Sequence, residues 1–148
     1  VEGRVVVRSM RRCVIWEEMG RAKRKTRVRA WSGEEVYKGR GVKGGQRVEG
    51  DGWGGRVGDT GTVNEHGGVG GSEKPFDSSF SRHQPASFGI GVGQVIRGWD
   101  RAVPGHNVGS RLVVSIPPAY AYGSHGVPQA GIGGDDTLVF VIDIIATR

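Results

Sequence analysis

The sequence predicts an α+β fold in which an antiparallel β-sheet carries one short helix on one face. Patterns typical of strands outnumber the single helical pattern, which begins at Gly93. Four apolar residues of this segment recur at helical period and form one stripe: Val95, Ile96, Trp99 and Val103. Nearby glycines limit the helix to about two or three turns. A tryptophan on so short a helix has to be buried, so we expect the helix to lie across the sheet.

The strands before this helix are short. Residues 60–63 predict a weak strand, and residues 67–71 are too rich in glycine to predict a strand. The segment 75–80 places Asp77 beside two phenylalanines, and residues 87–90 predict a further short strand.

The strands after the helix are better defined. Residues 111–117 predict a strand that the proline pair 117–118 ends, and residues 118–136 predict a long loop. Residues 137–145 then close the chain with an almost uninterrupted apolar run, which is typical of a central strand.

Charge divides the chain in two. Residues 1–47 hold 14 Lys/Arg and 5 Asp/Glu, a net charge of +9, whereas residues 48–148 hold 7 and 10, a net charge of −3. We therefore expect residues 1–46 to be a basic N-terminal extension, disordered or poorly defined, and residues 47–148 to form the folded domain. Within the extension, residues 10–27 are compatible with a basic helix. The basic run 21–29 fits either a phosphate-binding arm for nucleic acid or, as we favour, a solvated extension.

Several classes of protein are disfavoured. Cys13 is the only cysteine, so no disulfide can form within the chain, and no run of apolar residues is long enough to cross a membrane. A signal peptide is not visible, and we expect a cytoplasmic protein. The four histidines lack metal-ligand spacing, and no nucleophile elbow is present. The glycines of residues 89–93 are better explained as turns than as a phosphate loop.

The remaining candidates for chemistry are aromatic residues with a few polar neighbours. Asp77 and Arg82 accompany five aromatic residues: Phe76, Phe88, Trp99, Tyr122 and Phe140. This composition suits an apolar pocket with polar anchors, and it also suits an ordinary hydrophobic core. Composition alone favours the core.

The order of the motifs decides more than composition does. The segments Phe76-Asp77-Ser78-Ser79, Gly93-Gln94-Val95-Ile96-Arg97-Gly98-Trp99-Asp100, Val108-Gly109-Ser110-Arg111, Tyr120-Ala121-Tyr122-Gly123 and Thr137-Leu138-Val139-Phe140 follow one another along the chain. Together they resemble the FKBP-type peptidyl-prolyl cis-trans isomerases, and a bacterial member is most similar. The resemblance covers about residues 47–148 and implies a twisted antiparallel sheet wrapped around the short helix.

The resemblance also implies a site. Trp99 would form the floor of a pocket, and Asp77 would be a buried acid paired with Arg82. The Ile96 N–H and the Tyr122 hydroxyl would hold carbonyl oxygens, while Ile132 would belong to a loop over the pocket. The implied catalytic residues are Asp77, Tyr122, Phe76 and Trp99, and the implied substrate-binding residues are Arg82, Val95, Ile96, Ile132 and Phe140.

The implied enzyme is a monomer without cofactor or metal. It would act on proline-containing peptides and unfolded proteins, and would bind macrolides such as rapamycin. The alternative is a binding module with weak turnover that uses the basic extension as a partner-binding arm. The sequence departs from the family at the pocket tyrosine, whose place falls on Glu65 or His66, and at Ala86, which replaces a large aromatic residue.

Overall fold

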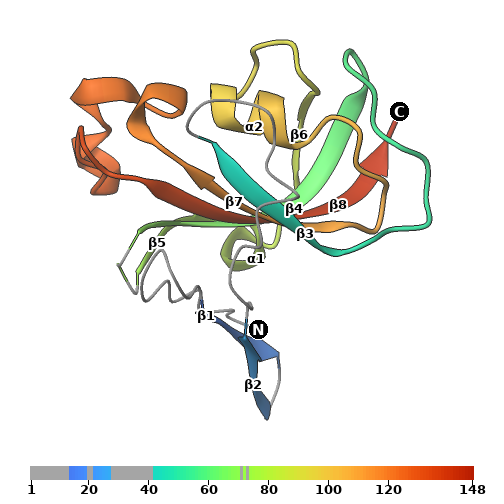
Figure 1. The fold of residues 1–148 in the computed structure, drawn as a ribbon, viewed down its shortest axis with the longest axis horizontal. Helices are drawn as coiled ribbons and strands as arrows, with labels where there is room; N and C mark the ends of the chain where they lie inside the picture. Colours follow the sequence, from blue (N-terminus) through green and yellow to red (C-terminus); the bar gives the residue numbers. More distant parts are fainter. Residues whose placement is uncertain (1–13, 20–21, 28–41, 71, 73) are drawn as a thin grey trace.

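The computed structural model describes residues 14–19, 22–27, 42–70, 72 and 74–148. Six strands form one antiparallel sheet, in which β3, β7, β8, β4 and β5 are consecutive neighbours and β6 also pairs with β4 (Figure 1). Their bounds are β3 (Lys43–Val48), β4 (Thr60–Val69), β5 (Pro75–Ser78), β6 (Ala86–Gly89), β7 (Arg111–Ile116) and β8 (Leu138–Thr147). The α+β class and the antiparallel sheet are confirmed.

The helix predicted around Trp99 is α2 (Arg97–Ala102), and it lies on one face of the sheet (Figure 1). Gly98 makes this packing close, because a Cβ at that position would lie 2.5 Å from Ile116 of β7. A second short helix, α1 (Ser79–Arg82), follows β5 directly and was not predicted. The long loop before β8 contains three turns of 3-10 helix: η1 (Pro118–Tyr120), η2 (Gly123–His125) and η3 (Pro128–Ala130).

Strand β8 is the central strand that its apolar run predicted. It pairs with β7 on one side and with β4 on the other. Alternate residues on its inner face are almost fully buried in the core with Trp99: Leu138, Phe140, Ile142 and Ile144. Val139 and Val141 on the opposite face are buried as well. The side chain of Arg111 bridges β7 to Asp143 of β8 through two hydrogen bonds of 2.6 and 2.7 Å.

Strand β4 corrects the sequence analysis, because it continues through Gly67 and Gly68 to Val69. The reason is packing against aromatic rings. A Cβ on Gly67 would lie 2.5 Å from the ring of Phe140 and 2.9 Å from that of Phe76. Pairing with β8 along the whole strand holds the glycines in the sheet, so tertiary contacts override their low strand propensity.

The described part of the N-terminal region also differs from the sequence interpretation. Residues 14–19 and 22–27 do not form a helix: β1 (Val14–Met19) and β2 (Ala22–Arg27) make a separate antiparallel pair. Strand β1 starts with two β-branched residues and a tryptophan, which favour an extended backbone. The other residues of the predicted extension before Val42 lie outside the described part of the chain. Among the residues described, no helix is long and apolar enough to cross a membrane.

Candidate functional site

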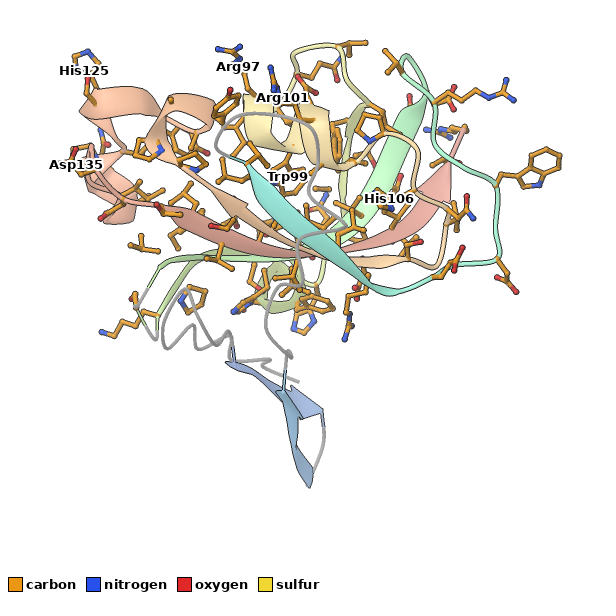
Figure 2. The ribbon with its side chains drawn as sticks, in the orientation of Figure 1. Arg97, Trp99, Arg101, His106, His125 and Asp135 are labelled. Atoms are coloured by element: carbon orange, nitrogen blue, oxygen red, sulfur yellow. The ribbon has the colours of Figure 1, made fainter. Side chains whose placement is uncertain are left out.

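A pocket of about 620 Å³ opens between α2 and the sheet. Trp99, only 6% exposed, lies between the helix and the strands (Figure 2). Its ring packs edge-to-face against Phe140 at 5.2 Å and against Phe88 at 5.3 Å between centroids. Phe76 packs in the same way on Phe140 at 5.5 Å. Edge-to-face contacts are the favourable geometry for aromatic pairs, so the apolar walls are held rigidly.

The turn before α2 positions the apolar residues that line the helix side of this pocket. The backbone N–H of Gly89 donates to Gln94 Oε1 at 2.7 Å, and that of Gly93 donates to Asp100 Oδ2 at 2.9 Å. Gly91 and Gly93 have φ angles of +69° and +81°, which favour glycine. These glycines are therefore turn residues, as the sequence analysis preferred, and they present Val95 and Ile96 to the pocket.

Other residues that line the pocket are charged. Arg82, at the end of α1, donates from one guanidinium nitrogen to Glu65 Oε1 at 2.9 Å and from the other to Asp77 Oδ1. The Asp77–Arg82 pair is the one that the resemblance implied. The expected burial of Asp77 is wrong, because its side chain is 49% exposed. The buried acid is Glu65, whose side chain is 3% exposed.

Glu65 is buried at this point because β4 changes partners there. Residues 60–63 of β4 pair with β6, and residues 66–68 pair with β5. Between them the Ser79 hydroxyl takes the place of a strand partner. It accepts from the Glu65 N–H at 2.8 Å and donates to the side-chain oxygen of Asn64 at 3.1 Å. Helix α1 thus supplies both this hydroxyl and Arg82.

His66, the other position considered for the missing tyrosine, does not line the pocket. It is 8% exposed, and its Nδ1 lies 3.0 Å from Ser78 Oγ. Burial lowers the pKa of the His66 imidazole below its usual value. Of these two positions, Glu65 is therefore the one that lines the pocket.

Two further residues that line the pocket carry a polar group without a partner among the described residues. Tyr122 follows η1, is 43% exposed, and its hydroxyl has no hydrogen bond to another described residue. The Ile96 N–H, immediately before α2, likewise has no acceptor there. Both groups are available to a ligand.

Eight of the nine predicted site residues line this pocket, and Ile132 does not. Ile132 is 3% exposed, forms a bridge with Val127 and belongs to the hydrophobic core. Two residues of the pocket were not predicted as site residues: Glu65, which has a partner of its own, and Gln94. The available signal for Glu65 was its place among alternate residues that are otherwise small or apolar: Gly61, Val63, Gly67 and Val69. No group of three His, Cys, Asp or Glu side chains within the described ranges is arranged to hold a metal ion.

Comparison with known proteins agrees with this geometry. Residues 55–145 match the model of a family described as FKBP-type peptidyl-prolyl cis-trans isomerase. An FK506-binding protein of Streptomyces anulatus is 41% identical over 98 residues, which cover 66% of this chain and 79% of that protein. The peptidyl-prolyl cis-trans isomerase FPR2 of Saccharomyces cerevisiae is 44% identical over 73 residues, which are 49% of this chain and 53% of that protein.

A solved structure shares the fold. The crystal structure of AtFKBP13 superimposes with a TM-score of 0.66 at 32% identity, over 72% of this chain and 93% of that one.

Proposed function

This chain belongs to the FKBP-type peptidyl-prolyl cis-trans isomerases, and from that premise we propose that it rotates Xaa–Pro bonds in the pocket above Trp99. The observation that carries the proposal is a rigid aromatic floor and walls, with free hydrogen-bonding groups at the rim. A proline ring is compact and apolar enough to pack on the Trp99 indole.

The pocket would act on the amide itself and needs no nucleophile. Rotation about a peptide bond faces a barrier of about 18–20 kcal/mol because resonance gives the C–N bond double-bond character. Resonance separates charge between the oxygen and the nitrogen of the planar amide, and the twisted amide loses this resonance. The twisted form is therefore less polar, so an apolar environment favours it over the planar form. Binding the twisted form better than either planar isomer speeds rotation tenfold for about every 1.4 kcal/mol of difference.

The unpartnered groups would fix the orientation of the twisted imide. We assign the Ile96 N–H and the Tyr122 hydroxyl to the carbonyl oxygens on either side of the proline. Phe76, Val95 and Phe140 would close the apolar walls around the ring. Asp77, held by Arg82, would orient polar groups at the rim. Ile132 would support the loop from the core rather than contact the substrate.

A protease-free isomerisation assay on a short proline peptide tests the proposal. We expect the full chain to accelerate the exchange between cis and trans forms, and rapamycin to inhibit it competitively. A chain that binds rapamycin with no measurable acceleration would instead support the binding module. Exchange spectroscopy by NMR reports the rate directly.

Macrolide binding has its own readout. Because a ligand in the pocket would pack on the indole of Trp99, we expect tryptophan emission to change on addition of rapamycin. Trp53, which is 88% exposed, is a suitable control, since the Trp53→Phe variant should keep the change. Unchanged emission at saturating macrolide would contradict the assignment of the pocket.

We also propose a role in protein folding, as a cytoplasmic monomer. The apolar pocket, which takes a proline ring without a cofactor, suits unfolded chains with many Xaa–Pro bonds. The single cysteine of the sequence suits a reducing compartment. Acceleration of a proline-limited refolding reaction, together with the mass measured by light scattering, tests these points.

A further inference from the structure

The charged side of the pocket contains an acceptor that the mechanism above does not use. Glu65 is 2% exposed and lines the pocket. Its Oε1 accepts from Arg82 at 2.9 Å, whereas its buried Oε2 has no hydrogen-bond partner among the described residues. An unsatisfied buried carboxylate oxygen is costly, and a ligand that donates to it would remove that cost.

The charges around Glu65 do not cancel. The residues that line the pocket include two carboxylates, Glu65 and Asp77, and one guanidinium, that of Arg82. Their formal sum is −1. The cations of α2 lie elsewhere, because Arg97 and Arg101 point away from the sheet (Figure 2) and stack on Tyr120 at 5.4 and 4.8 Å. The pocket therefore has a net negative end.

The reaction places a particular side chain near that end. If the proline ring packs on Trp99, as the proposed function requires, the residue before proline supplies the acyl side of the rotating bond. Its side chain is then the nearest part of the substrate to the rest of the pocket. Glu65 and Arg82 come from β4 and α1, and they line the same pocket as the residues that precede α2.

We propose that Glu65 is a specificity residue, and that its free carboxylate oxygen selects prolyl peptides with a cationic side chain before the proline. Such a side chain donates a charge-assisted hydrogen bond to Oε2 and balances the net charge of the pocket. Hydrogen bonds of this kind are stronger than neutral ones, and burial strengthens them further.

The test compares two peptides that differ only in charge, Ala-Lys-Pro-Phe and the same peptide with norleucine in place of lysine. With the full chain at low salt, we expect kcat/KM to be about tenfold higher for the lysine peptide, which corresponds to about 1.4 kcal/mol. The difference should appear mainly in KM and shrink as salt is added.

Variants identify the side chain that causes the preference for the lysine peptide. In Glu65→Gln we expect the ratio of the two kcat/KM values to fall to about two or less. Arg82→Met should raise the ratio above that of the unmodified chain, because both carboxylates lose their cation. The matched control is Asp135→Asn, which makes the same charge change on an exposed residue outside the pocket and should leave the ratio unchanged. Thermal unfolding of each variant shows whether it is folded. If Arg82→Met does not fold, the ratio measured for Glu65→Gln decides the specificity role by itself.

Failure of the specificity role and failure of the proposed function give different results. Rotation of both peptides at equal kcat/KM by the unmodified chain would overturn the specificity role and leave the isomerase intact. Rotation of neither peptide would overturn the proposed function. In that case, isothermal titration decides the specificity role: tighter binding of the lysine peptide that is lost in Glu65→Gln supports it, and equal affinities overturn it.

Discussion

Trp99 has two roles at the scale of the single residue, one in the core and one in the pocket. Its ring contacts Phe88 and Phe140, and it belongs to the same buried cluster as β7 and β8. Loss of a buried tryptophan to alanine typically costs about 3–5 kcal/mol. A substitution at Trp99 therefore changes stability and the pocket together, and the rim residues are better probes of function.

Tyr122 and Asp77 are such probes. We expect Tyr122→Phe and Asp77→Ala to weaken macrolide binding by about twofold to tenfold, as expected for one hydrogen bond of about 0.5–1.5 kcal/mol. Peptide isomerisation should fall less, because it depends mainly on desolvation. Tyr122 is 43% exposed, so its hydroxyl contributes little to stability. Titration calorimetry and the exchange assay measure the two effects, and equal losses in both would contradict this division.

His66 makes stability depend on pH. Burial lowers the pKa of its imidazole in the folded state, so the unfolded chain binds the proton more readily. The contribution of His66 to the free energy of unfolding should therefore be fully present above about pH 6.5. It should decline as the pH falls below that value, by at most about 1.4 kcal/mol per pH unit. Urea unfolding between pH 5 and 8 measures the slope.

The control for this effect is His66→Asn, which keeps a polar atom near Ser78 Oγ but does not titrate. The variant should show a shallower decline below pH 6.5 than the unmodified chain. Identical slopes in the two proteins would assign the pH dependence to other groups.

At the scale of the element, β4 offers a matched pair of glycines. A Cβ on Gly67 would meet the rings of Phe140 and Phe76 at 2.5 and 2.9 Å, whereas the nearest described atom to a Cβ on Gly68 would be the Lys74 carbonyl oxygen, at 3.8 Å. Overpacking typically costs about 1–3 kcal/mol. We expect Gly67→Ala to lower the unfolding free energy by this amount and to displace the pocket walls, while Gly68→Ala is nearly neutral. Similar stabilities for the two variants would show that the rings move aside easily.

The same glycines explain where sequence patterns failed. Strands β7 and β8 could be predicted because their apolar periodicity is a local signal. The end of β4 could not, since Gly67 is required by the rings of Phe76 on β5 and Phe140 on β8, whose positions depend on how the strands pair. Helix α1 escaped prediction because four residues give no periodicity, although its Ser78 N-cap is visible afterwards.

The site shows the same limit. The aromatic residues of the pocket could be identified from ordered motifs. That Glu65 is buried and Asp77 is exposed depends on where β4 lacks a partner between its pairing with β6 and its pairing with β5. Only the pairing of the strands reveals this position. The position of Ile132 in the core depends on its bridge to Val127, inside a loop without a pattern.

For the whole molecule, the sheet determines where the folded domain begins. Strand β3 pairs with β7 from Lys43 onward, and Val42 is 1% exposed in the core. The strands β1 and β2 form a separate sheet. The domain is thus built from residues that start slightly before the change in charge at position 47. The proposed pocket residues all lie after position 64.

Two truncations test this boundary. Removal of residues 1–41 keeps β3, and we expect melting temperature and isomerase activity close to those of the full chain. Removal of residues 1–49 deletes an edge strand together with Val42, whose burial alone is worth about 1.5–3 kcal/mol, so this chain should be strongly destabilised. The shorter truncation also removes most of the positive charge. Any affinity for nucleic acid should therefore disappear with it, and should already fall steeply with salt in the full chain. Aggregation of the chain that starts at Val42 would contradict the expectation. It would indicate that the domain needs residues before Val42 to stay in solution.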